Sequence, residues 1–303
     1  MKSVSTYLIT LSLLFSMSVA AQQEFLTTHY MFNGLALNPA YAGVHDGVSA
    51  SFLSRNQWVG FEGAPSTQVA TIHSPLSGRP VSLGAALFRD QLGLSTEYGA
   101  YFSYAYRIPI TKELKLSMGL QFSTHSFAVE YSQAENGVFD AGDNLGDISE
   151  FKWNVGSGAL LHTDRLFVGF SVPQMLNKSV GVPNPDGNFS QLVRHYYLFA
   201  GYAFSLGRNM VLKPNVLVKS VGNAPAQIDL NANLLIKSFL WVGASYRSKD
   251  SIDGILGFQI TPQLLVSYAT DFSLTDIDNQ SHEIMINYIF ELPTKKILTP
   301  RYF

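Results

Sequence analysis

Alternating hydrophobic and polar positions run through most of the chain after residue 46 and predict β-strands. The clearest case is residues 227–237. Its apolar face carries Ile228, Leu230, Ala232, Leu234 and Ile236, and its polar face carries Gln227, Asp229, Asn231, Asn233 and Lys237. A period of two with one wholly apolar face is typical of a strand that keeps one side out of water. Residues 98–107, 263–273 and 281–291 repeat the pattern.

About fourteen such segments follow one another between residues 47 and 291. The connections after even-numbered segments are tight, whereas those after odd-numbered segments are generally longer and reach their maximum at 127–150 and 174–192. A soluble sandwich has no reason to gather its long loops at one end. Outer-membrane barrels have short periplasmic turns and long outer loops, and their strands of about ten residues match the bilayer. We therefore predict an all-β fold: a transmembrane antiparallel β-barrel of the outer membrane over 47–291.

The composition supports a wall that faces lipid. Charged residues make up 14% of the chain and aromatic residues 13%, whereas ordinary soluble domains carry about 25% charged residues. A large soluble β-sandwich or jelly roll is the alternative, and its outer faces would need more charge than this chain supplies. The near balance of 20 Lys+Arg against 22 Asp+Glu gives no reason to expect nucleic acid as a partner.

The N-terminal residues predict export. Lys2, the apolar run 7–15 and small residues up to Ala21 have the layout of a signal peptide over 1–21. That run is about half the length of a membrane span, which disfavours a retained anchor. The chain has no Cys, so a lipid-modified cysteine, disulfides and thiolate metal sites are excluded. An even number of strands would then leave both termini, including a C-terminal tail over 292–303, in the periplasm.

Catalytic and metal-binding patterns are absent from the sequence. The seven His are scattered without an HxH or HxxxH pair, and no GxSxG motif occurs. We expect no enzyme activity, no cofactor and no resident metal. The acidic loop 140–147 offers Asp140, Asp143, Asn144 and Asp147 as calcium ligands. It lacks the EF-hand spacing, so a solvated surface loop is the expected structure and calcium the alternative.

Residues 22–46 precede the first strand and are too apolar for a solvated tail. Burying each large side chain here is worth roughly 1.5–3 kcal/mol, and a barrel of this size has a lumen too wide for its own side chains to fill. We expect this segment to plug the periplasmic half of the lumen, with docking of a periplasmic partner as the alternative. The first strand ends near Arg55, Gln57 and Trp58. A Trp at such a place usually anchors a barrel at the membrane boundary. The candidate plug or partner-binding residues are Tyr30, Met31, Phe32, Asn33, Asn38, Pro39, Tyr41, Arg55, Gln57 and Trp58.

Several motifs are similar to those of the PorP/SprF family of the Bacteroidota. They are Tyr30–Asn33 (YMFN), Asn38–Gly43 (NPAYAG), Arg55–Phe61 (RNQWVGF) and Gly63–Pro65 (GAP), with Trp241–Ser248, Ser281–Met285 and Pro300–Phe303 further along. The resemblance covers essentially the whole chain after the signal peptide, and its N-terminal block is the specific part. One departure is Gly34, where many relatives are expected to have Pro.

This resemblance implies a non-enzymatic outer-membrane component of the type IX secretion system, often linked to gliding motility. It further implies that the protein docks or retains a secreted adhesin, or the adhesin's C-terminal secretion domain, with other components of the secretion system as further partners. The alternative function is a passive porin or a channel for hydrophobic solutes. An open water path would favour that alternative, whereas a docking barrel can be plugged.

Overall fold

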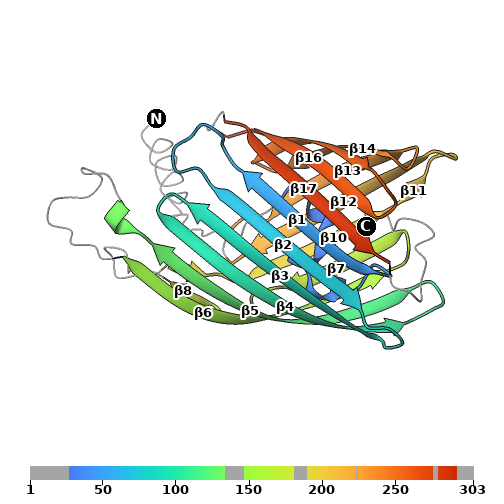
Figure 1. Ribbon diagram of the computed structural model, residues 1–303, viewed down its shortest axis with the longest axis horizontal. Coiled ribbons are helices and arrows are strands. Elements are labelled where there is room, and N and C mark those ends of the chain that lie inside the picture. Colours follow the sequence, from blue (N-terminus) through green and yellow to red (C-terminus); the bar gives the residue numbers. More distant parts are fainter. Residues whose placement is uncertain (1–26, 134–146, 181–189, 223, 276–278, 292–303) are drawn as a thin grey trace, which may run out of the picture.

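The computed structural model describes residues 27–133, 147–180, 190–222, 224–275 and 279–291. The described residues form a closed β-barrel of fourteen wall strands (Figure 1). These strands are β1 (Val48–Asn56), β2 (Ser66–Pro75), β3 (Val81–Leu92), β4 (Ser95–Pro109), β5 (Lys115–Val129), β6 (Ile148–His162), β7 (Leu166–Val172), β10 (His195–Tyr202), β12 (Met210–Val221), β13 (Gln227–Ile236), β14 (Leu240–Arg247), β15 (Ser251–Gln259), β16 (Leu264–Ser273) and β17 (Ser281–Phe290). The predicted fold class and strand number are confirmed.

Every wall strand is antiparallel to its neighbours, and two pairings close the ring. The first and last strands join from Val48↔Phe290 to Asn56↔His282. On the other side, β10 pairs with both β7 and β12. The two-residue strand β11 (Phe204–Ser205) continues β10 against β12, and β8 (Lys178–Val180) with β9 (Ser190–Leu192) forms a separate hairpin. Because every strand in the ring has a neighbour on each side, most backbone polar groups of the wall are paired, as a lipid environment requires.

Residues along each strand alternate between the lipid side and the lumen, as the pattern predicts. Leu230 is 52% exposed and Phe272 49%, whereas Asn231, Asn233 and Asp271 are buried. The lumen-facing surface is less polar than predicted. An apolar cluster on it contains Leu53, Val69, Ala86, Phe88, Tyr101, Leu235, Trp241, Leu265 and Met285. Phe32, from the stretch before β1, packs against this cluster, so these side chains meet protein inside the barrel.

The two ends of the barrel differ, and we name them by their connections. The long-loop end carries residues 57–65, 130–147 and 173–194, whereas the short-turn end carries 76–80, 110–114 and 163–165. Strands β4, β5 and β6 are each 15 residues long, and two of them, β5 and β6, extend past the limits predicted from the pattern, which shortens the 127–150 loop. At the long-loop end, β5 is followed by η4 (Tyr131–Gln133), which lies at the left of Figure 1.

Two connections at the long-loop end are tight, contrary to the general pattern. Residues 93–94 join β3 to β4, and 248–250 join β14 to β15. Gly93 and Lys249 have positive φ angles of 56° and 60°, which such short hairpins require. No helix within the described residues is long and apolar enough to cross a membrane.

Candidate functional site

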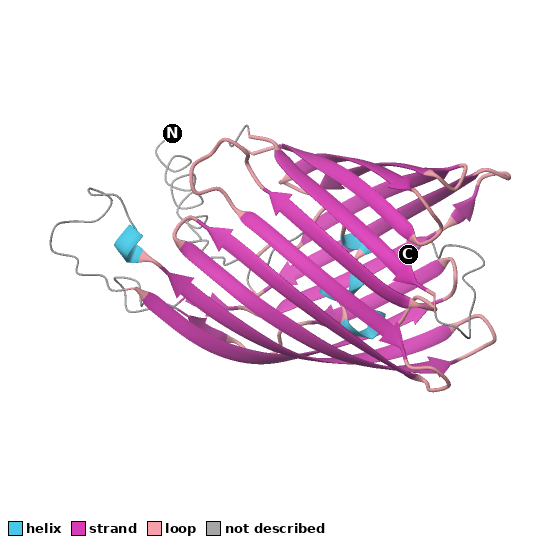
Figure 2. Ribbon diagram, viewed as in Figure 1, coloured by secondary structure: helices cyan, strands magenta, loops and turns pink. Residues whose placement is uncertain are grey.

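The lumen holds the stretch that precedes β1. This lumen segment, Thr27–Asp46, contains three single 3₁₀ turns: η1 (Tyr30–Phe32), η2 (Gly34–Ala36) and η3 (Pro39–Tyr41). Figure 2 shows them as cyan turns inside the magenta barrel. Tyr30, Met31, Leu35 and Tyr41 are each at most 4% exposed and share one apolar cluster with inward-facing side chains of the wall. The segment is therefore packed as a protein core.

Asn38 and Pro39 fix the third turn of the segment, η3, against the wall. The Asn38 side chain accepts a hydrogen bond from the Ala40 N–H at 2.8 Å, and Pro39 begins the turn, where its missing N–H costs nothing. The Asn38 amide also donates to the carbonyls of Ala159 and Phe170 at 3.1 and 3.2 Å. These bonds tie η3 to β6 and β7.

Glycines in the wall make room for η3. A Cβ at Gly119 would overlap the backbone of Pro39 and Ala40, and one at Gly158 would overlap the Asn38 side chain. Gly34, within the segment, lies against the Tyr41 ring in the same way. Gly in the middle of a strand often marks a close backbone approach, and here that approach is between wall and segment.

The opposite end of the segment is held by a buried carboxylate. The Glu283 side chain accepts from the N–H groups of Thr28 and His29, each at 2.9 Å, and its Oε1 lies 2.6 Å from Nδ1 of His29. Arg55 lies 3.2 Å from Glu283 and 2.5 Å from Asp271. Asp271 also accepts a bond from the Thr28 hydroxyl at 2.7 Å. Wall charges and segment backbone form one network here.

A second buried charge cluster surrounds Arg247. Its guanidinium lies 3.2 Å from Asp229 and 3.8 Å from Asp253, and its side chain is 2% exposed. Ser245 and the Tyr30 hydroxyl donate to Asp229 at 2.7 and 3.4 Å. The segment thus takes part in this cluster through Tyr30.

Lys213 holds the middle of the segment. Its ammonium donates to the Met31 carbonyl at 3.0 Å and lies 5.1 Å from the centre of the Phe32 ring and 5.7 Å from that of Phe167. A cation at that distance from an aromatic face is attracted to it. Phe32 also packs edge-on against Trp241, with ring centres 5.4 Å apart. Polar and aromatic contacts therefore hold the segment at both ends and in its middle.

The lumen segment extends beyond the half of the lumen that the sequence suggested. Gly43 lies near the short-turn end, where its N–H donates to His73. Thr28 and His29 reach Glu283, the third residue of β17 counted from its long-loop end. The physical reason is electrostatic, because Glu283, Asp271 and Arg55 supply buried partners for the backbone of Thr28 and His29 only at that level.

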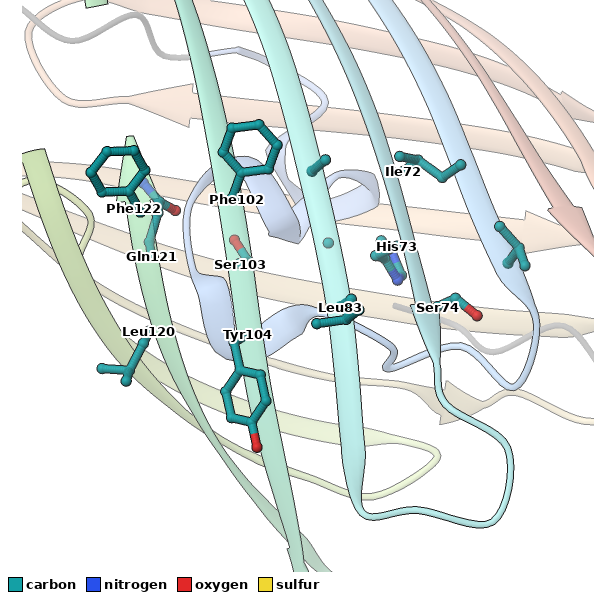
Figure 3. Close-up of a pocket in the computed structure, with 13 residues that line it drawn as sticks. Ile72, His73, Ser74, Leu83, Phe102, Ser103, Tyr104, Leu120, Gln121 and Phe122 are labelled. Carbon is teal, nitrogen blue, oxygen red and sulfur yellow. The ribbon is translucent and has the colours of Figure 1, made fainter. Parts of the chain in front are cut away.

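A hollow of about 600 Å³ lies on the wall across β1–β5. Its apolar lining comes from alternate, outward-facing side chains, shown in Figure 3: Ile72, Leu83, Phe102, Tyr104, Leu120 and Phe122. Since these residues belong to the lipid-facing set of the strands, the hollow is part of the surface that faces the membrane interior. We assign it no ligand.

A family model described as "Type IX secretion system membrane protein PorP/SprF" matches residues 19–288. The chain belongs to the PorP/SprF family. No curated protein matches the chain. The barrel fold and the family together show an outer-membrane protein of the type IX secretion system.

Solved barrels of low identity share the architecture of this PorP/SprF member. The CymD monoaromatic hydrocarbon channel has 12% identity and a TM-score of 0.53, covering 86% of this chain and 93% of that one. The toluene transporter TbuX of Ralstonia pickettii has 11% identity and a TM-score of 0.51, covering 85% and 93%. At such identities the likeness shows the fold alone.

The structure brings most of the predicted site residues of this PorP/SprF member together and leaves two apart. Tyr30, Met31, Phe32, Asn33, Asn38, Pro39 and Tyr41 lie in the lumen segment, and Arg55 belongs to the Glu283 network. Asn33 accepts a bond from Thr71 at 3.1 Å. Gln57 and Trp58 lie past the end of β1, where their backbone N–H groups donate to Pro65 and Ser281. Both side chains are partly exposed.

The wall residues that hold the segment belong to no sequence motif that would mark them as a site. Glu283, Asp229, Arg247 and Lys213 fall on the lumen side of their strands, which their place in the alternation indicates. In an empty barrel the same positions would face water. Only the burial of residues 27–46 turns them into partners of one segment.

Most of the candidate calcium loop 140–147 lies outside the described residues. Asp147 is described: it accepts from the N–H and the hydroxyl of Ser132, each at 2.9 Å, and these bonds lower the pKa of its carboxyl. Within the described ranges there is no group of three or more His, Asp or Glu side chains placed to hold a metal.

A single methyl group should disturb the packing of η3. We expect Gly119→Ala to lower the free energy of unfolding by about 1–3 kcal/mol, because the added Cβ meets backbone that has no rotamer to change. Urea titration in lipid vesicles measures this. Gly254→Ala is the matched control, since the nearest atom to its added Cβ is 4.0 Å away. Equal stability of the two variants would contradict the close packing of η3 on β5.

Proposed function

We propose that this protein is a non-enzymatic docking barrel that retains a secreted adhesin, or its C-terminal secretion domain, at the cell surface. The observation that carries the proposal is the lumen segment, packed from Gly43 at the short-turn end to Thr28 near the long-loop end. A docking barrel works with a filled interior, whereas a porin or a hydrophobic-solute channel needs a path through it.

The proposed orientation places the short turns in the periplasm and the long-loop end at the cell surface, as in other outer-membrane barrels. The end of β17 at Phe290 then faces the periplasm. The two chain termini lie outside the described residues, and their periplasmic location is part of the proposal. Other components of the secretion system would approach from the short-turn end, where the segment meets β2 and β3.

Docking should depend on the long connections, because loops carry recognition on a rigid scaffold. We expect replacement of residues 134–146 by a short Gly-Ser linker to leave the barrel at its normal level in the membrane, since loop length changes stability only weakly. Retention of the cognate adhesin should fall several-fold. The measurement is a strain carrying this variant, scored for barrel level, solute uptake and adhesin on the cell surface.

A matched control replaces the short turn 110–114 by a linker of equal length. This control acts at the opposite end and should leave adhesin retention unchanged. Normal adhesin together with altered solute uptake in the 134–146 variant would overturn docking in favour of the channel.

A further inference from the structure

One strand of the wall runs well past its neighbour. Strand β6 pairs with β5 along its full length, from Ile148↔Val129 to His162↔Lys115. On its other side β6 pairs with β7 only from Ser157↔Val172 to His162↔Phe167. Among the described residues, no strand continues this second ladder toward Ile148. The far side of β6 is therefore a sheet edge at the long-loop end.

The chain after β7 turns inward and does not follow this edge. Pro173, which has no N–H to give to a ladder, follows β7 directly, and its carbonyl lies where a Cβ of Gly156 would be. The Met175 N–H still donates to the Val155 carbonyl at 2.8 Å. Next, the Leu176 backbone both donates to and accepts from the inward-facing Asn154 amide, at 2.9 and 2.7 Å. These bonds hold residues 173–176 against the inner face of β6.

The backbone direction along β6 follows from the bond to Val155. In an antiparallel sheet, the N–H and C=O of one residue point to the same side, and that side alternates along the strand. Since the Val155 carbonyl points away from β5, the backbone groups of Phe151 and Ser149 do so as well. They present donors and acceptors about 6.8 Å apart, two residues along the strand.

The edge lies beyond the membrane interior. A tilted strand needs about 9–11 residues to cross the hydrocarbon, and β6 has 15. Counted from His162 at the short-turn end, the residues before Trp153 extend past that thickness. Unpaired backbone is too costly within lipid, but outside it an open edge is a template for another strand.

We propose that the edge of β6 at Ser149–Phe151 docks an extended strand from the secretion domain of the secreted protein. This inference rests on the function proposed above and assigns its docking site. Only a polypeptide backbone offers alternating donors and acceptors at the required spacing, and adding a strand to a sheet edge is a known mode of peptide recognition. The incoming strand would place apolar side chains beside Phe151, which is 68% exposed. Its charged side chains would lie beside the Lys152–Glu150 ion pair, which measures 3.2 Å.

Proline substitutions test the edge with little effect on the wall. Ser149→Pro and Phe151→Pro each remove one N–H that points away from β5, and proline is tolerated at sheet edges. Ser149→Ala and Phe151→Ala are the matched controls, because they keep the N–H. We expect the double proline variant in detergent to bind the purified secretion domain about tenfold to thirtyfold more weakly than the double alanine variant.

Cross-linking reports the register even if the proline variants fold poorly. The chain has no Cys, so Ser149→Cys creates a unique thiol. The secretion domain carries a single Cys placed at successive positions of its terminal strand. Disulfides at every second position support strand addition. Disulfides at consecutive positions, or disulfides formed only between two barrel molecules, overturn it.

The two proposals fail in different ways. If the wild-type barrel does not bind the secretion domain, the proposed function and the docking edge both fall. If the wild type binds and the proline variant binds equally well, the docking edge falls and the proposed function stands.

Discussion

Replacing Glu283 with alanine is expected to lower the free energy of unfolding by about 3–5 kcal/mol, the usual cost of removing one partner of a buried charge pair. The change removes one of the two carboxylates that pair with the Arg55 guanidinium and removes the acceptor from the Thr28 and His29 N–H groups. Urea unfolding in lipid vesicles measures the loss. Because the same carboxylate anchors the lumen segment, ion conductance in planar bilayers should rise in parallel.

The control for this prediction lies at the other end of the same strand. Glu291, just past β17, is exposed and accepts one hydrogen bond from Gln263 at 2.8 Å. Glu291→Ala should change stability by less than about 0.5 kcal/mol, as surface substitutions usually do. If Glu283→Ala unfolds at the same urea concentration as Glu291→Ala, the network does not hold the segment.

Leu230→Arg is expected to destabilise the barrel by about 2–4 kcal/mol in lipid vesicles, because it places a charge on the lipid face near the middle of its strand. Leu230 is the fourth of ten residues in β13 and is 52% exposed. Ile228→Arg, on the same face near the strand end, should cost about 0–1 kcal/mol. The stability of the same two variants is also measured in detergent, where a long charged side chain adapts readily, and the two sets of values are compared. Equal costs at the two depths would contradict a lipid-facing wall.

The wall strands could be predicted from the sequence because each strand has lipid on one face and the lumen on the other, so hydrophobic and polar residues alternate along it. Leu230 and Asn231 are adjacent in the chain and face opposite sides: the apolar Leu230 is exposed on the lipid side, and the polar Asn231 is buried on the lumen side. Strand ends are less well marked. Residues 127–129 (FAV) and 148–150 (ISE) belong to β5 and β6, but these short stretches do not carry the regular hydrophobic–polar alternation by which the rest of the two strands was predicted.

The sequence could predict that an apolar segment lies in the lumen, but it could not predict which wall residues this segment contacts. The apolar residues of 29–43 require a partner surface, but no local pattern specifies which surface. Lys213 illustrates this point: in the sequence it is a polar residue on the lumen side of a strand, and in the fold its ammonium meets the carbonyl of Met31. Met285 and Leu53 show the opposite case, as apolar residues on the lumen side that are buried against other inward-facing side chains. Contacts between segments so far apart in sequence are set by the closed ring.

Glu283 also links the interior to the order of assembly. It lies on β17, the last strand of the wall, yet it binds the backbone of Thr28, 255 positions earlier in the chain. Contacts across such sequence separations form late, because the intervening chain must be ordered first. The first residues of the segment therefore wait for the strand that pairs with β1 and completes the ring. The same strand closes the wall and binds the first residues of the segment, so we expect ring closure and ordering of these residues to occur together during folding.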